Sequence, residues 1–198
     1  MSLLRHHLDG LYRTDARGRL TAVNQWDGGP VPRLHLCRST DGNHWRVRAD
    51  LDEQTAFALD ALCRAEPTLG DPRREPDLAG DAIRLLEAHS PVEAIWHGPV
   101  FAFAATPAVS EAPGTVAITP ANARLLEARL PDWLPDVPHR QPFLAALVDG
   151  DAVAVCASVR ITPAVHAAGV ETHPDFRRRG LARRVVGAWA AAVRRLGA

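Results

Sequence analysis

Residues 169–182 combine a strand-like run, a turn and an arginine-rich loop directly before a helical pattern. The turn is Pro174-Asp175, and the loop carries three consecutive arginines at 177–179, followed by Gly180. N–H groups at a helix N-terminus have no acceptor within the helix and lie at the positive end of its dipole. Glycine lets the backbone approach a ligand closely, and arginines add charge-assisted hydrogen bonds. This segment therefore predicts an anion site that would fit a pyrophosphate.

The charged residues restrict the chemistry that the chain can perform. Among its 198 residues, 23 basic and 23 acidic residues give a net charge of zero, and no lysine occurs. Schiff-base enzymes, pyridoxal-phosphate enzymes and phosphate loops ending in Gly-Lys-Ser/Thr need a lysine amine, so these classes are excluded. Seven arginines and no acid fall within the last 22 residues, so the local field there favours a polyanionic ligand.

The elements around the arginine loop resemble the GNAT superfamily of N-acetyltransferases. Arg177-x-x-Gly180-x-Ala182 lies between an apolar strand and an amphipathic helix, as does the family's acyl-CoA signature, Arg/Gln-x-x-Gly-x-Gly/Ala. The preceding hairpin, residues 142–160, resembles the second and third strands of that fold, and residues 122–130 resemble an early helix. The resemblance covers residues 116–198. It implies transfer of an acetyl group from acetyl-CoA, a small-molecule acyl-CoA partner, to an amine acceptor by direct attack.

The resemblance also implies roles for individual residues. Backbone groups near positions 170–172 would pair with the pantetheine arm, and the N–H groups of residues 178–183 would hold the pyrophosphate. The implied acyl-CoA-binding residues are Val170, Glu171, Thr172, Arg177, Arg178, Arg179, Gly180, Leu181, Ala182 and Arg183. Strand alternation points Glu171 away from its two neighbours, where it could act as the catalytic base, directly or through water. The alternative for Glu171 is a bond to a neighbouring arginine.

The chain departs from the family pattern after the arginine loop and its helix. The pattern continues with another strand, a helix that often carries a tyrosine acid, and two final strands, but this sequence stops at Ala198. The one tyrosine, Tyr12, lies outside the matched region, so no thiolate acid is assigned. We expect a truncated chain, which could be inactive in this form and could self-associate through the open edge of a strand at 165–172. The alternative function is a non-catalytic, degenerate module that binds CoA or a partner.

Other chemically suggestive residues have structural interpretations. Cys156 and Ser158 lie in an apolar run without a Gly-x-Ser-x-Gly elbow or an evident base, so we interpret them as buried small residues. No His-Glu-x-x-His motif occurs, and His166 and His173 would lie on opposite faces of a strand, so no metal is expected. Trp133 either lines an acceptor pocket or packs over a loop. The arginine-rich tail lacks the aromatic platforms of a single-strand binder, so no nucleic-acid partner is expected.

The N-terminal half, which the resemblance does not cover, is predicted to contain both strands and helices. Alternating runs separated by turn residues predict a small antiparallel sheet or meander at 20–26, 33–38 and 43–49. Helical spacing predicts helices at 52–66 and 78–89. Two further strands are expected at 92–96 and 100–104. The adjacent histidines, His6 and His7, are interpreted as a solvated pair.

A proline-punctuated connection at 105–114 separates this half from the elements that position the arginine loop. These comprise a strand at 116–119, a helix capped by Thr119-Pro120 and ending near Leu130, a hairpin of 143–148 and 152–159, a strand at 165–172 and a helix at 180–196. The fold class is α/β (α+β mixed sheet). We divide the chain into an N-terminal α+β region of unknown role, residues 1–112, and a GNAT-like acetyl-CoA-binding region, residues 113–198.

The cysteines and the apolar runs indicate the compartment. Cys37, Cys63 and Cys156 are widely spaced, odd in number and in no Cys-x-x-Cys pattern, which fits a reducing cytoplasm. The most apolar run, residues 100–109, is interrupted by Pro107 and too short to span a bilayer. We therefore expect a cytoplasmic protein without a membrane partner.

Overall fold

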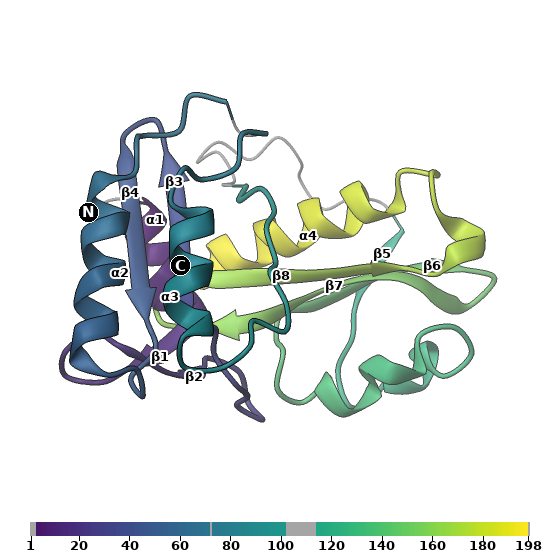
Figure 1. Ribbon diagram of the computed structural model, residues 1–198. Coiled ribbons are helices and arrows are strands. Elements are labelled where there is room, and N and C mark those ends of the chain that lie inside the picture. Colours follow the sequence, from purple (N-terminus) through teal and green to yellow (C-terminus); the bar gives the residue numbers. More distant parts are fainter. Residues whose placement is uncertain (1–2, 72, 102–113, 198) are drawn as a thin grey trace. The chain divides into compact units, whose positions relative to one another are not determined.

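The computed structural model describes residues 3–71, 73–101 and 114–197 (Figure 1). The chain consists of two compact units, residues 1–101 and 102–198. The division predicted between residues 112 and 113 falls at the end of 102–113, a segment outside the described residues. Both units combine helices with antiparallel strand pairs, so the mixed α/β class predicted from the sequence is confirmed.

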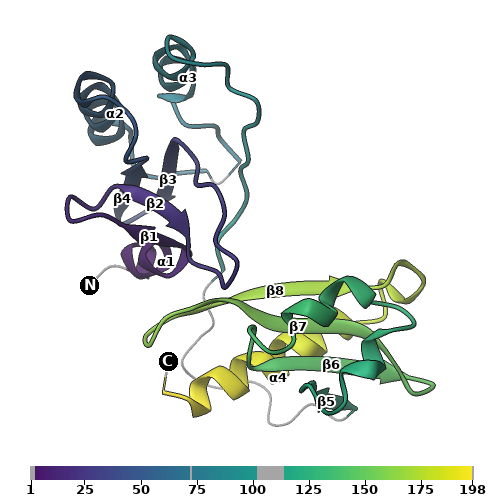
Figure 2. The same cartoon turned by 90° about the horizontal axis from the view of Figure 1, so that it is seen from below.

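The strands of the N-terminal unit form two antiparallel pairs (Figure 2). These pairs are β1 (Tyr12–Thr14) with β2 (Leu20–Val23), and β3 (Leu34–Ser39) with β4 (Gly42–Val47). A single parallel bridge joins Leu20 to Arg48. The three predicted strands are present, but β2 pairs with β1 rather than with β3. An irregular excursion separates β2 from β3, and positive φ angles at Gly28 and Gly29 turn the chain within it.

Helix α1 (Leu3–Leu11) was missed in the sequence analysis. It has no acidic residue in its first turn and no basic residue in its last turn, so the usual terminal signals are missing. Its leucines do have helical spacing, because Leu4, Leu8 and Leu11 stand at i, i+4 and i+7, and this short pattern was overlooked. The two histidines expected to be a solvated pair, His6 and His7, are both half-buried, and burial lowers the pKa of His7.

The two predicted helices of this unit are confirmed as α2 (Glu53–Ala65) and α3 (Ala79–Glu87). Asp52 caps α2, because its carboxylate accepts a hydrogen bond of 2.9 Å from the N–H of Thr55. Both helices contribute buried side chains to one core, to which hairpin β3–β4 adds partly buried ones. The buried members of that core are Leu51, Leu59, Cys63, Leu78, Ala82 and Leu86.

The strand predicted at 92–96 is wrong, since residues 91–101 have no regular secondary structure. Ile95 and Trp96 are 65% and 80% exposed, so the apolar side chains that suggested a strand do not pack in a sheet. Residues 100 and 101 are also irregular, and the remainder of the strand predicted at 100–104 lies outside the described residues.

The C-terminal unit is built on a four-stranded antiparallel sheet in the order β5-β6-β7-β8. Its strands are β5 (Thr115–Ala117), β6 (Phe143–Val148), β7 (Asp151–Ile161) and β8 (His166–Thr172). The predicted hairpin is confirmed, and its turn residues Asp149 and Gly150 have φ angles of 52° and 91°. Two successive left-handed residues are what a tight hairpin turn requires. The strand predicted at 116–119 lies slightly earlier in the chain.

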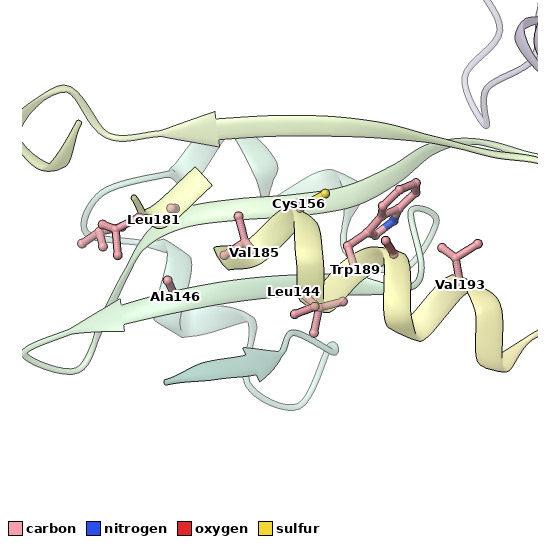
Figure 3. Close-up of a cluster of buried hydrophobic side chains, with 11 residues drawn as sticks. Leu144, Ala146, Cys156, Leu181, Val185, Trp189 and Val193 are labelled. Carbon is pink, nitrogen blue, oxygen red and sulfur yellow. The ribbon is translucent and has the colours of Figure 1, made fainter. Parts of the chain in front are cut away.

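Both faces of this sheet are covered, which explains why β6 and the middle of β7 are apolar. Helix α4 (Leu181–Arg195) lies on one face and the 3-10 turns η1 (Ala123–Leu126) and η2 (Pro131–Asp136) lie on the other (Figure 1). The predicted C-terminal helix is thereby confirmed. Figure 3 shows the buried stripe of this helix against the sheet, where Leu181, Val185, Trp189 and Val193 pack with Leu144, Ala146 and Cys156.

The helix predicted from Thr119 to Leu130 is wrong, because only the short turn η1 forms there. Asn122 explains the difference. Its Oδ1 accepts from the N–H of Thr119 at 2.7 Å, and its Nδ2 donates to the carbonyl of Ala117 at 2.9 Å. An asparagine that bonds to the local backbone stabilises a turn at the expense of a helix, so Thr119 does not act as a helix cap.

Candidate functional site

The segment singled out by the sequence analysis begins at β8, an edge strand of the C-terminal sheet. In the described part of the chain β8 pairs with β7 alone, in a register that places Val155 opposite Glu171. The N–H of His173 donates to the carbonyl of Val153 at 2.9 Å. In an antiparallel pair, alternate residues bond to the partner, so the main chain of Glu171 faces β7 and that of Val170 and Thr172 faces the open edge.

The side chain of Glu171 lies on the face of the sheet that η1 and η2 cover. Its Oε2 accepts a hydrogen bond of 2.6 Å from the indole Nε1 of Trp133 in η2. Trp133 is itself held by an edge-to-face contact with Phe143, with ring centroids 5.5 Å apart, and by the guanidinium of Arg140, 5.6 Å from its centroid. The alternative of a bond from Glu171 to a neighbouring arginine is therefore wrong: an indole N–H holds the carboxylate.

Gly169 permits this contact between η2 and β8. A Cβ at this position would overlap the Cγ1 of Val159 and lie 3.1 Å from Cη2 of Trp133. The contact between Trp133 and Glu171 was not predicted from the sequence. A glycine inside a strand pattern, which often marks a close approach of another segment, was the signal that could have indicated it.

The loop between β8 and α4 is shaped by arginine contacts and by two left-handed residues. After the short turn η3 (Pro174–Phe176), Arg178 and Gly180 have φ angles of 61° and 75°. The guanidinium of Arg177 donates to the carbonyl of Thr172 at 3.2 Å, and that of Arg179 donates to the carbonyl of Asp175 at 3.0 Å. The guanidinium of Arg179 also lies 5.0 Å from the ring centroid of Phe176. The loop is therefore folded back toward β8 with its arginines exposed.

Helix α4 begins directly after this loop without a side-chain cap. Gly180 occupies the N-cap position, and its carbonyl accepts the first intrahelical hydrogen bond, of 3.1 Å, from the N–H of Arg184. The N–H groups of residues 181–183 therefore have no acceptor within the helix. Leu181 is 7% exposed and packs in the core, so it can offer only its main chain to a ligand, whereas Ala182 and Arg183 are exposed. Apart from its chain neighbours, no atom lies within 4 Å of a Cβ placed on Gly180, so a ligand can approach the main chain there.

These features bring together most of the residues that the sequence analysis singled out. Residues 170–172 lie on the edge strand, 177–180 form the arginine loop and 181–183 form the first turn of α4. Exposed arginines, N–H groups without helical acceptors and the positive end of a 15-residue helix make an arrangement suited to an anion. Next to this anion site, the open edge of β8 can accept and donate main-chain hydrogen bonds.

Ser158 has a partner that the sequence analysis did not find. Its Oγ lies 2.9 Å from Nδ1 of His166 and accepts a hydrogen bond of 2.9 Å from Nε1 of Trp189. A register shift between β7 and β8 brings His166 beside it, so the statement that no base is near was wrong. Burial lowers the pKa of His166. Since Ser158 is 1% exposed, the three side chains form a core contact between β7, β8 and α4, as the interpretation of a buried small residue requires.

The described residues contain neither a metal-binding cluster nor a membrane-spanning helix. Within residues 3–71, 73–101 and 114–197, no group of three or more His, Cys, Asp or Glu side chains is arranged to hold a metal ion. None of the described helices is both long and apolar enough to cross a bilayer. The three cysteines are buried free thiols, and burial raises the pKa of Cys37 to about 11 and that of Cys156 to about 12.

Comparison with known proteins identifies the C-terminal unit. The family model of the acetyltransferase (GNAT) family matches residues 113–198. A crystal structure of a protein from Novosphingobium aromaticivorans, described as a GNAT-family acetyltransferase, is 24% identical with a TM-score of 0.34. That match covers 50% of this chain and 44% of the other, so this chain spans less than half of its length. No curated protein matches the chain. The C-terminal region of the chain, residues 113–198, belongs to the acetyltransferase (GNAT) family.

Proposed function

We propose that residues 113–198 bind acetyl-CoA and transfer its acetyl group to the nitrogen of an amine. The observation that carries this proposal is the loop at 177–180, which presents exposed arginines and a left-handed glycine directly before the uncapped N-terminus of α4. A pyrophosphate is the group that such a site suits best, because it accepts several N–H bonds and carries the charge that arginines and a helix N-terminus favour.

Different residues of this unit would contact different parts of acetyl-CoA. The N–H groups of residues 178–183 and the side chain of Arg177 would hold the pyrophosphate. The pantetheine arm carries amide groups, which would pair with the main chain of Val170 and Thr172 at the open edge of β8. The open space around Gly180 leaves room for this approach. Leu181 would contribute its N–H alone, because its side chain is buried in the core.

Glu171 is the proposed general base. The nitrogen of the amine attacks the thioester carbonyl carbon, the C–S bond breaks, and the thiolate of CoA leaves. The attacking nitrogen loses a proton, which Glu171 takes directly or through water. Trp133 bonds to Oε2 of the carboxylate at 2.6 Å and so fixes its orientation, leaving Oε1 to accept the proton. Trp133 is a positioning residue in this scheme.

Calorimetric titration of the 198-residue chain with acetyl-CoA tests the site. Gly180→Trp would place an indole at the entrance to the N-terminus of α4. Gly197→Trp is a matched control at the other end of the helix, because both glycines have positive φ (75° and 85°) and open space around the Cβ position. We expect Gly180→Trp to weaken binding by about tenfold or more, equivalent to about 1.4 kcal/mol, and Gly197→Trp to leave it unchanged.

The outcomes of this titration separate the functions under consideration. Failure of the folded wild-type chain to bind acetyl-CoA would overturn the proposal. Saturable binding that is sensitive to Gly180→Trp, together with acetyl transfer to any member of a panel of amines, would support it. Binding without transfer would support instead a non-catalytic CoA-binding module. We further propose a cytoplasmic location, which the three free thiols support.

A further inference from the structure

The N-terminal unit contains a cleft of about 480 Å³ that has no place in the proposed acetyl transfer. It runs along strand β4, between the turn that joins β1 to β2 and one face of helix α2. Five consecutive strand residues, 43–47, line it. In a strand, successive side chains point to opposite faces, so a cleft that touches every one of them lies along the edge of the strand.

That edge of β4 has main-chain groups directed into it. β4 pairs with β3 on its other side, and the N–H of Arg48 donates to the carbonyl of Arg33 at 2.9 Å. Because bonding to an antiparallel partner alternates along a strand, Asn43 and Trp45 direct their N–H and carbonyl groups away from β3. One of these groups, the carbonyl of Trp45, already accepts a hydrogen bond of 3.1 Å from the guanidinium of Arg46. Among the described residues, the bridge between Leu20 and Arg48 is the one strand contact at this edge, and it lies at the end of the strand.

The charges around the cleft leave an excess of arginine. Glu53 on α2 accepts hydrogen bonds of 2.7 Å from both Arg17 and Arg19. The other carboxylate of the lining, Asp60, bonds to the indole of Trp45 and to the guanidinium of Arg64. One carboxylate shared by two guanidiniums leaves a local positive charge, and the side chain of Arg17 is 70% exposed beside it. A ligand carboxylate at this position would gain charge-assisted hydrogen bonds.

An exposed aromatic ring lies next to this charge. Phe57 is 76% exposed, and it lines the cleft one helical turn beyond Glu53. Four helical residues rise about 6 Å, close to the roughly 6.7 Å between alternate residues of a strand. An extended chain that lies along β4 could therefore place an acidic side chain at Arg17 and an apolar side chain, two residues away, at Phe57.

We infer that this cleft is a peptide-binding site, at which an extended segment with an acidic residue two positions from an apolar one adds as a strand to the edge of β4. Main-chain hydrogen bonds to Asn43 and Trp45 would provide the pairing, as in other cases of strand addition. Arg17 and Phe57 would select the side chains. This site is independent of acetyl-CoA and of the proposed transfer, so the two proposals can fail separately.

The probe for this site is a blocked heptapeptide, Thr-Val-Thr-Glu-Thr-Val-Thr, whose palindromic order suits either strand direction. Titration into the ¹⁵N-labelled full chain, followed by NMR, is expected to show saturable binding with Kd below about 1 mM and to shift the amides of Asn43 and Trp45. A peptide with Gln in place of Glu is expected to bind about tenfold more weakly, because it loses the charge-assisted bond. Two N-methylated peptides test the main-chain pairing. One carries N-methyl groups on the threonines and the other carries them on the valines and the glutamate. Because alternate residues direct their N–H groups to the same edge of a strand, one of the two peptides should not bind.

Exposed residues give variants that leave the fold intact. Arg17→Gln and Phe57→Ser should each weaken binding about fivefold or more. Arg73→Gln and Phe101→Ser replace exposed residues of the same types outside the cleft, and should leave binding unchanged. Equal binding of the Glu and Gln peptides, binding of both N-methylated peptides, or amide shifts that avoid β4 would overturn the inference. So would no binding of the peptide, or a dimer formed through β4 that the peptide does not displace.

Discussion

At the scale of single residues, the proposed chemistry depends on Glu171. Its strand directs the carboxylate to the face opposite Val170 and Thr172, and the indole of Trp133 fixes one of its oxygens. The main chain on either side faces the open edge of β8. The acyl donor and the base would therefore use the same short strand through different groups: the main chain of two residues and the side chain of the residue between them.

Replacing Glu171 by glutamine tests its role as a base. Glu171→Gln keeps an acceptor for the indole N–H of Trp133 but removes the group that takes a proton. We expect kcat for acetyl transfer to fall by about 10²- to 10⁴-fold while the Kd for acetyl-CoA changes little. Glu127→Gln, at an exposed carboxylate of the same unit, is the control and should retain full activity. Full activity in Glu171→Gln would remove this residue from the mechanism.

At the scale of elements, the sequence predicted those that carry a strong local signal. The hairpin β6–β7, the strand β8 and the helix α4 were predicted nearly to their ends, because apolar runs and the Asp149-Gly150 turn mark them. One element depended on interactions that local pattern does not show: Asn122 bonds to the backbone around it and replaces the predicted helix with a turn. Helix α1 was missed although Leu4, Leu8 and Leu11 have helical spacing, because it lacks the charged residues that mark helix ends.

The part of the candidate site that is contiguous in sequence was predicted, and the contacts between distant residues were not. The arginine loop and the start of α4 are contiguous in sequence, so a short motif was enough to find them. The contacts of Trp133 with Glu171 and of Ser158 with His166 were not predicted. The first joins residues 38 positions apart, and the second depends on a register shift between β7 and β8. Neither the packing of η2 on the sheet nor an irregular register has a strong sequence signature.

The close approach of η2 to β8 makes a prediction about stability. In Gly169→Ala the added methyl group would overlap Val159 and press on Trp133, so we expect a loss of about 1–3 kcal/mol in the free energy of unfolding. Gly70→Ala is a suitable control, because nothing lies within 4 Å of its Cβ position and its φ is not positive. Urea unfolding of both variants measures the difference. Equal stability of Gly169→Ala and the wild-type chain would contradict the packing described for η2.

At the scale of the whole molecule, each unit has its own buried core. The N-terminal unit also contains a half-buried histidine, His35, whose pKa is strongly lowered. Burial and the charge of His7 lower the pKa of His35 to about 4, and its Nδ1 lies 2.7 Å from the hydroxyl of Tyr12. A histidine whose pKa is lowered on folding binds its proton more readily in the unfolded chain. Its contribution to stability is therefore present above about pH 6.5 and is lost as the pH falls toward 4.

The pH dependence of unfolding tests this contribution. Between pH 7 and pH 5, we expect His35 to account for a loss of about 2 kcal/mol in the free energy of unfolding. His35→Gln removes the titrating group and should flatten the profile of the N-terminal unit by that amount. Urea titrations at the two pH values, with and without the substitution, give the comparison. Parallel profiles for the two proteins would show that His35 titrates normally in the folded chain.

The central claim is that the arginine loop and the start of α4 bind acetyl-CoA, and amide hydrogen exchange of the full chain tests it most directly. With saturating acetyl-CoA, the account predicts slower exchange at residues 178–183 and at Val170 and Thr172, whose N–H groups face the open edge of β8, and no change in the N-terminal unit. Bound acetyl-CoA that leaves these amides unprotected, or protects residues of the N-terminal unit instead, would contradict the account.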